Sequence, residues 1–300
     1  MPTKPLLITL DTSTALRDTL IASERFEAGE CRVRQFPDGE SYVRIESECA
    51  GRDVAILCTL NRPDRLIVPL LFCAQTLREL GAASVGLIAP YLAYMRQDIR
   101  FHAGEAINAK LFAELLSAYF DWLTTVDPHL HRIHDLSDIY SIPQRTLSAV
   151  PLLAQWLERE VDKPLLIGPD SESEQWVANV AKLAHAPYLV LEKIRRSDRD
   201  VQISVPDLER WRGHTPVLID DIISTGHTLL EVIDRMRGMG LERPACAAVH
   251  GLFCEDAEAK LLAAGARRIV TCNTIEHPSN GIDVSGLLIE AVAELRASAD

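Results

Sequence analysis

The stretch VLIDDIISTGHT, residues 217–228, decides the fold. Its first three residues are apolar and predict the end of a buried strand. From Thr228 onward, apolar residues recur at the spacing of a helix, namely Leu229, Val232, Ile233 and Met236. The polar segment between is therefore a strand-to-helix loop. In open parallel sheets, ligands bind beyond the carboxyl ends of the strands, and a helix that begins there points free N–H groups at an anion.

This loop combines two kinds of chemistry. Hydroxyl donors and a glycine that permits close backbone approach suit a phosphate; they are Ser224, Thr225, Gly226 and Thr228. Asp220 and Asp221 would repel a phosphate, but their oxygens suit sugar hydroxyls or Mg²⁺. The combination predicts a site for a phosphorylated sugar. The alternative is a helix N-cap preceded by two solvated acids.

The rest of the chain repeats one unit: an apolar run, a polar turn, an amphipathic helix, a glycine and another apolar run. Residues 53–92 and 215–253 are two copies in opposite halves of the chain. We therefore expect an α/β protein with two related domains, 1–145 and 146–300, each a mainly parallel sheet flanked by helices. The join falls within SIPQRTLSAVP, residues 141–151, and the last helix is a candidate to pack back on the first domain.

Composition excludes several classes of function. The 300 residues carry a formal charge of -12, which repels nucleic acid backbones and anionic membrane surfaces. No stretch approaches 18 apolar residues and the first residues do not form a signal peptide, so we expect a cytoplasmic protein. The seven cysteines include no Cys-x-x-Cys pair, so neither a disulfide framework nor a zinc site is indicated.

Residues 217–228 resemble the ribose 5-phosphate loop of the phosphoribosyltransferase fold, which the transferases share with ribose-phosphate diphosphokinase, the phosphoribosyl diphosphate synthetase. Further segments are similar to the diphosphokinase family: FPDGESYVRI (36–45), PYLAYMRQD (90–98), DPH (127–129), GPD (168–170) and the Lys-x-Arg at 193–195. The resemblance extends from about residue 36 to about residue 228. It implies two tandem phosphoribosyltransferase-like domains.

The resemblance also implies roles for individual residues. ATP would be bound by Phe36, Asp38, Glu40, Arg96 and Gln97, the first three acting in a neighbouring subunit's site. His129 and Asp170 would hold Mg²⁺, and Lys193 and Arg195 would be catalytic. Ribose 5-phosphate would be bound by Asp220, Asp221, Ser224, Thr225, Gly226, His227 and Thr228. A homo-oligomer is implied, a dimer at least and by family a hexamer.

The residue types agree with these roles. An aromatic face suits a purine, and an arginine fork suits phosphate oxygens. Taken singly, each has a plainer reading: Phe36 as core, Arg96 as solvated, His129 as structural, and residues 192–200 as a mobile surface loop. The nearby His131 and His134 do not match the family motif and are left out of the site.

The implied reaction converts ATP and ribose 5-phosphate into phosphoribosyl diphosphate and AMP. Two stretches depart from the family pattern. Acidic Ser171–Trp176 replaces small residues and glycine, and residues 99–105 replace a more basic run linked to phosphate and ADP regulation. Two alternatives remain: a phosphoribosyltransferase, which would consume phosphoribosyl diphosphate, and a non-catalytic regulatory homologue.

Overall fold

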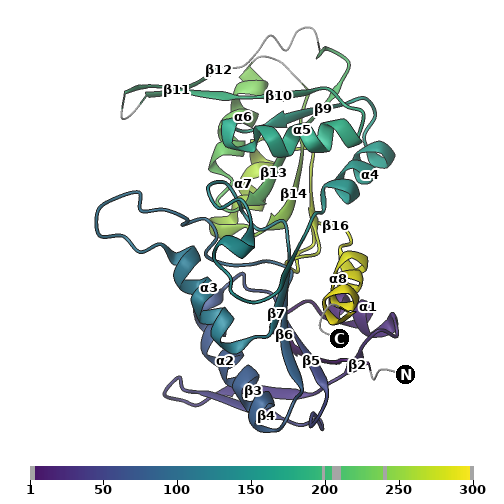
Figure 1. Cartoon of the computed structure of the whole chain (residues 1–300). Coiled ribbons are helices and arrows are strands. Elements are labelled where there is room, and N and C mark those ends of the chain that lie inside the picture. The colour runs from purple at the N-terminus through teal and green to yellow at the C-terminus, as the bar shows by residue number, and fades with distance from the viewer. Residues whose placement is uncertain (1–3, 198–199, 205–210, 239–241, 298–300) are drawn as a thin grey trace. The chain divides into compact units, whose positions relative to one another are not determined.

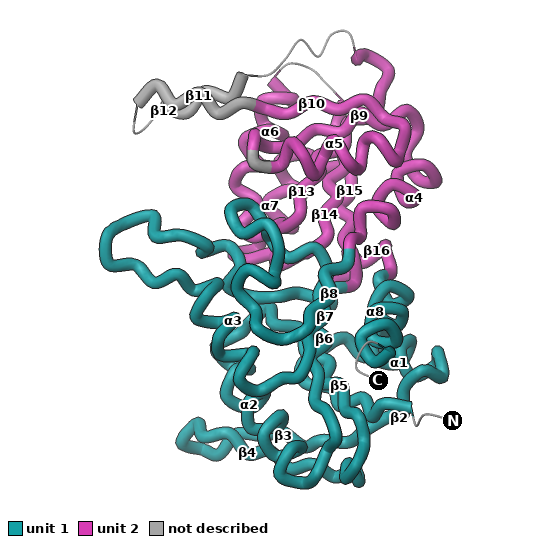
Figure 2. Tube along the Cα trace, in the orientation of Figure 1, with its two compact units in different colours: residues 1–147, 274–276, 284–300 teal, residues 148–273, 277–283 magenta. Residues whose placement is uncertain are grey.

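A computed structural model describes residues 4–197, 200–204, 211–238 and 242–297, with only the backbone described for Glu172 and residues 192–204. The chain forms two compact units (Figure 2). Unit 1 comprises residues 1–147, 274–276 and 284–300, and unit 2 comprises residues 148–273 and 277–283. No helix within the described residues is long and apolar enough to cross a membrane.

Unit 1 is built on a six-stranded parallel sheet in the order β2-β1-β5-β6-β7-β8. The strands are β1 (Leu6–Leu10), β2 (Glu27–Ala28), β5 (Asp53–Cys58), β6 (Ser84–Ala89), β7 (Trp122–Val126) and β8 (Gln144–Leu147). The central strands are continuous apolar runs because helices cover both faces of the sheet. Figure 1 shows α2 (Pro63–Glu79) and α3 (Asn108–Tyr119) on one face and α1 (Thr14–Ala22) on the other.

Unit 2 repeats this architecture with the order β10-β9-β13-β14-β15-β16. Its strands are β9 (Pro164–Gly168), β10 (Tyr188–Val190), β13 (Thr215–Ile223), β14 (Ala245–Gly251), β15 (Arg268–Cys272) and β16 (Asn280–Ile282). Their helices are α5 (Glu174–Leu183), α6 (His227–Gly238) and α7 (Ala257–Ala264). All pairings in this sheet are parallel. The prediction of an α/β protein with two related, mainly parallel sheets is confirmed.

The internal repeat extends beyond the sheets. Each unit inserts an antiparallel hairpin between its second and third strands: β3 (Cys31–Gln35) with β4 (Ser41–Ile45), and β11 (Glu192–Ser197) with β12 (Asp200–Ser204). In each half a helix follows the sixth strand, α4 (Val150–Glu160) after β8 and α8 (Ser285–Ala297) after β16. The two halves of the sequence therefore have equivalent elements in the same order.

The final helices are exchanged between the units. Helix α4 groups with unit 2, where it packs against α5, and α8 groups with unit 1, where it packs against α1, β7 and β8. Arg296 of α8 donates to Asp53 of β5, with Nη2 2.7 Å from Oδ2. The predicted division fell after residue 145, with the last helix as a candidate to pack back on the first domain. Unit 1 runs to Leu147 and also contains 274–276 and 284–300, the second of which includes α8.

Candidate active site

The two adjacent carboxylates belong to a strand and not to the turn that follows it. The sequence placed the end of the apolar strand at Ile219, but β13 continues to Ile223, with Asp220 paired to Ala248 and Ile223 to Gly251 of β14. That placement was wrong because a parallel neighbour continues the hydrogen-bond ladder regardless of side-chain polarity. Both acids are therefore held by a rigid sheet.

Asp220 lies in an unfavourable place for a charge. Burial, followed by repulsion from Asp221 and Asp170, raises the pKa of Asp220 well above its ordinary value. The backbone N–H of Asp221 donates to Asp220 Oδ1 at 3.0 Å. Three carboxylates of unit 2 therefore influence one another, and hydroxyl donors or a cation would relieve their repulsion.

The turn after β13 consists of only Ser224, Thr225 and Gly226, because α6 begins at His227. Gly226 has φ +69°, a left-handed conformation that favours glycine. The loop that follows β14 supports this turn. The backbone N–H groups of Leu252 and Cys254 donate to the carbonyls of Ile223 and Ser224. The result is a short, fixed turn that leads directly into the N-terminus of a helix.

The first two residues of α6 differ in their surroundings. The His227 side chain is 80% exposed, and its Nε2 lies 3.2 Å from Glu231 of the next turn. Thr228 follows within the first turn of α6, at the end of the helix dipole that attracts a negative charge. This end of α6 can therefore accept an anion.

Asp170 lies just beyond the carboxyl end of β9, the neighbour of β13 in the sheet. It is extended, with φ -160°, and its carboxylate accepts a hydrogen bond from the N–H of Ser173. Ser173 is buried and donates its hydroxyl to the carbonyl of Asp170 at 2.7 Å. Glu174 is exposed in the first turn of α5, where a negative charge is favourable. The unusual Ser and Glu residues thus include a turn-forming serine and a helix-terminal acid.

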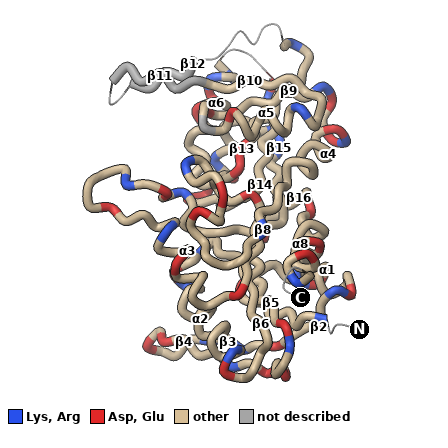
Figure 3. Tube along the Cα trace, viewed as in Figure 1, with Lys and Arg blue, Asp and Glu red and all other residues tan. Residues whose placement is uncertain are grey.

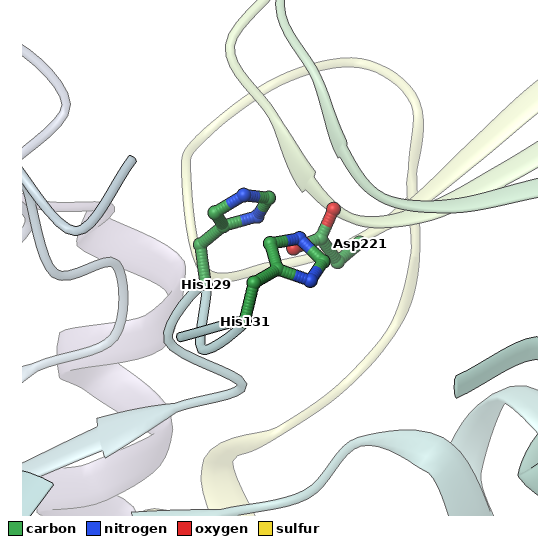
Figure 4. Close-up of side chains that lie close together, drawn as sticks. All are labelled: His129, His131 and Asp221. Atoms are coloured by element: carbon green, nitrogen blue, oxygen red, sulfur yellow. The ribbon is translucent and has the colours of Figure 1, made fainter. Parts of the chain in front are cut away.

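In unit 1, the loop after β7 carries two histidines with touching rings. The ring centroids of His129 and His131 lie 4.1 Å apart in an edge-on arrangement (Figure 4). Figure 4 also draws Asp221, which belongs to unit 2. His131 was left out of the predicted site, yet the structure brings its imidazole to that of His129. The sequence signal for this ring contact was the spacing of the two histidines, because side chains two positions apart on an extended segment lie on the same side.

The same loop is tied to the predicted ATP segment by an ion pair. Arg132 Nη1 lies 3.1 Å from Oδ1 of Asp98, whose side chain is 4% exposed. The N–H of Arg132 also donates to Asp98. Neither residue was among the predicted site residues, because nothing in the sequence shows that residues 34 positions apart would pair.

Gln97 and Arg96 lie beside this ion pair in the chain. The amide of Asn108, the first residue of α3, donates to Gln97 Oε1 at 2.6 Å, and the N–H of Ala109 donates to the Gln97 carbonyl. Gln97 is therefore fixed by the start of a helix. Arg96 is exposed, so its guanidinium is accessible to a ligand.

The remaining ATP-binding candidates lie at the tip of the β3–β4 hairpin. Phe36, Asp38 and Glu40 are all exposed, and the N–H of Phe36 donates to the carbonyl of Glu40 at 2.8 Å. Arg34 stacks on Phe36 and on Tyr42, with its guanidinium carbon 4.4 and 4.3 Å from the ring centroids. Phe36 is thus not a core residue, and its ring is presented on a rigid hairpin.

The two catalytic candidates fall in strand β11. The backbone pairs Lys193 with Ile203 and Arg195 with Val201 of β12, so the segment is a hairpin strand and not the loop that its charges suggested. The side chains of Lys193 and Arg195 lie outside the described residues.

Comparison with known proteins gives the family. Residues 6–119 match the N-terminal domain of ribose phosphate pyrophosphokinase, and residues 136–285 match the phosphoribosyl transferase domain. The ribose-phosphate pyrophosphokinase of Methanothermobacter thermautotrophicus is 34% identical over 87% of this chain and 90% of its own. That of Methanopyrus kandleri is 34% identical over 96% and 99%. The chain belongs to the ribose-phosphate pyrophosphokinase family.

A solved pyrophosphokinase structure shares the fold. The phosphoribosylpyrophosphate synthetase of Mycobacterium smegmatis has a TM-score of 0.85 over 98% of this chain and 99% of that one, at 24% identity. This likeness shows that the fold is shared over nearly the whole chain. The family models and the relative from Methanopyrus kandleri confirm the predicted relationship over both units, including parts of the chain outside residues 36–228.

Proposed function

We propose that the protein transfers the β,γ-diphosphoryl group of ATP to the C1 hydroxyl of ribose 5-phosphate, giving phosphoribosyl diphosphate and AMP. One observation carries the proposal: in a chain of the pyrophosphokinase family, Asp220 and Asp221 lie near the carboxyl end of β13, and the three-residue turn after this strand leads into the N-terminus of α6. Carboxylates for hydroxyls and amides for a phosphate together suit a phosphorylated sugar.

The sugar phosphate would bind across this turn. The 5-phosphate would accept hydrogen bonds from the hydroxyls and N–H groups of residues 224–228, and Gly226 would let the backbone approach it. Asp220 and Asp221 would accept from the ribose hydroxyls and orient C1.

ATP would bind at residues of unit 1. Arg96 would hold phosphate oxygens and Gln97 the ribose, with the helix-bound amide of Asn108 keeping Gln97 in place. Phe36, Asp38 and Glu40 would recognise the adenine of a neighbouring copy, which is supported by their exposure at a hairpin tip. The enzyme would then be at least a dimer.

Mg²⁺ is the proposed metal. Within unit 2, the carboxylates of Asp170 and of the Asp220–Asp221 pair fit a hard cation, which would relieve their mutual repulsion. In unit 1, His129 is the other ligand that the resemblance to the family implies. When bound, Mg²⁺ would neutralise charge on the ATP phosphates.

In the proposed reaction, the C1 oxygen forms a bond to the β-phosphorus as the bond from that phosphorus to the bridging α-phosphate oxygen breaks. AMP leaves with the electron pair, and the hydroxyl proton is released. Lys193 and Arg195 would stabilise the negative charge that develops on the transferred phosphates.

Phosphorus NMR of the protein with ATP, Mg²⁺ and ribose 5-phosphate tests this function. We expect AMP and a sugar-linked diphosphate to form together, and neither to form without ribose 5-phosphate. Formation of ADP in place of AMP would refute diphosphoryl transfer. ATP binding without turnover would make the protein a non-catalytic homologue.

A further inference from the structure

Unit 1 contains a cavity that the proposed reaction does not use. Its volume is about 170 Å³, and its lining is mainly polar; the lining residues include Asp11, Thr12, Thr59, Asn61, Arg62 and Glu276. All of these residues belong to unit 1. Glu276 is part of segment 274–276, with which the second half of the chain returns to unit 1. Thr59 donates to the carbonyl of Thr274, and this contact holds the returning segment at the cavity.

The cavity lies where an α/β sheet binds ligands. Strands β1 and β5 are neighbours, but the helices that follow them cover opposite faces of the sheet (Figure 1). Adjacent strands of this kind leave a crevice at their carboxyl ends, which is the usual ligand position. Asp11 comes directly after β1, and Thr59 directly after β5.

The internal repeat gives the same crevice a counterpart in unit 2. There β9 and β13 are equivalent to β1 and β5 in order, and the loops at their ends carry Asp170 and the turn at 224–226. Unit 1 thus has an acid after β1 and a polar loop after β5. Unit 2 has the same arrangement after β9 and β13. The loops of unit 1 differ in sequence, but they carry the same classes of polar group.

Four side chains at the cavity have unused hydrogen-bonding capacity. Within the described residues, Asp11, Asn61, Arg62 and Glu276 make no side-chain hydrogen bond or ion pair, although each lines the same small space. Thr12 and Thr59 are hydrogen-bonded to each other, with their hydroxyl oxygens 2.9 Å apart, and so join the loops that follow β1 and β5. The donors and acceptors at the cavity are therefore available to a ligand.

We propose that this cavity binds a small phosphorylated sugar as a second site, separate from the one in unit 2. Asp11 and Glu276 would accept hydrogen bonds from sugar hydroxyls, Asn61 could both donate and accept, and Arg62 would pair with the phosphate. The positive charge of Arg62 would repel a metal ion, so this cavity is not a simple metal site. The volume is below the roughly 300 Å³ at which sites for drug-sized ligands begin, so a pentose phosphate fits better than a nucleotide.

Equilibrium dialysis of the whole protein with radiolabelled ribose 5-phosphate, without ATP, tests the proposal. We expect two molecules bound per chain. The double variant Asp220→Asn with Asp221→Asn should keep one of them. Adding Arg62→Ala to that variant should weaken the remaining site by about tenfold or more, as for loss of a charge-assisted hydrogen bond. Arg65→Ala, at an exposed arginine three residues further on that does not line the cavity, is the matched control and should change nothing.

The inference rests on unit 1 alone, so its outcome is distinct from that of the proposed function. If unit 2 binds no sugar phosphate, the wild type should still bind one molecule, and Arg62→Ala should weaken it. No binding to the unit 2 variant, or binding that Arg62→Ala leaves unchanged, would overturn the proposal. So would binding of Mg²⁺ alone that Asp11→Asn abolishes, with no sugar phosphate bound. Because Arg62 is exposed, circular dichroism should show an unchanged fold.

Discussion

Arg132 and Asp98 join two loops that follow neighbouring strands of unit 1, β7 and β6. Asp98 is buried and Arg132 is its cation, so Arg132→Met leaves a carboxylate without compensation. We expect a loss of about 1 to 3 kcal/mol in the free energy of unfolding, measured by urea denaturation. Asp98→Asn in the Arg132→Met background should recover part of this loss. A loss as large in the double variant would mean that Arg132 acts through packing alone.

Asp220 should make stability depend on pH. Because its folded pKa is raised, the wild type has the full contribution of this group below the unfolded value, about 3.9, and loses it as pH rises through the folded pKa. Asp220→Asn should therefore raise the melting temperature at neutral pH without divalent cations, and the gain should shrink towards about pH 4. Asp162→Asn, at an exposed carboxylate, should show no such trend.

Gly226 should be intolerant of a side chain. Alanine would occupy a left-handed conformation, and its Cβ would lie 3.2 Å from Leu261 Cδ1. We expect Gly226→Ala to cost about 1 to 2 kcal/mol of stability and to weaken ribose 5-phosphate binding. Gly238→Ala, in the same helix with open space around it, should instead be neutral or stabilise by up to about 1 kcal/mol. Equal effects of the two substitutions would contradict the role of the turn.

Phe36 should affect ATP binding without affecting the fold. Phe36→Ser removes a ring that is 39% exposed, so the melting temperature should be nearly unchanged, whereas the KM for ATP should rise several-fold with little change in kcat. Tyr188→Ser, at a ring that is 40% exposed in unit 2, is the control and should leave the KM unchanged. A large drop in stability with an unchanged KM would exclude the hairpin tip from the ATP site.

Lys193 should act mainly in the transition state. Lys193→Ala is expected to lower kcat by at least about a hundredfold while ATP binding, measured by calorimetry, changes little. Lys182→Ala, at an exposed lysine of α5, should have no effect on either quantity. An equal loss of ATP affinity with turnover preserved would assign Lys193 to ground-state binding.

The charge of the molecule disfavours a polynucleotide as a partner. Lys and Arg are interspersed with Asp and Glu along the described parts of both units, in a chain with a net charge of -12 (Figure 3). A bound phosphate must therefore be held by local groups such as a helix N-terminus or a single arginine, because the overall field is repulsive.

The sequence by itself determined the fold class, the repeat and the family. Apolar runs followed by polar turns and helical periodicity are local patterns, and the strand-to-helix turn at 224–226 is one of them. It could also nominate residues at strand ends, since the carboxyl ends of parallel strands meet at one edge of a sheet.

Only the tertiary structure decided which distant groups meet. It extended β13 through both aspartates, paired Asp98 with Arg132, set His131 against His129 and exchanged the last helix of each half. It also brought Glu276 to the loops after β1 and β5 and so formed the cavity of unit 1. The physical reason is that these contacts depend on sheet register and on the path of the chain between elements, which residues near each position in the sequence do not specify.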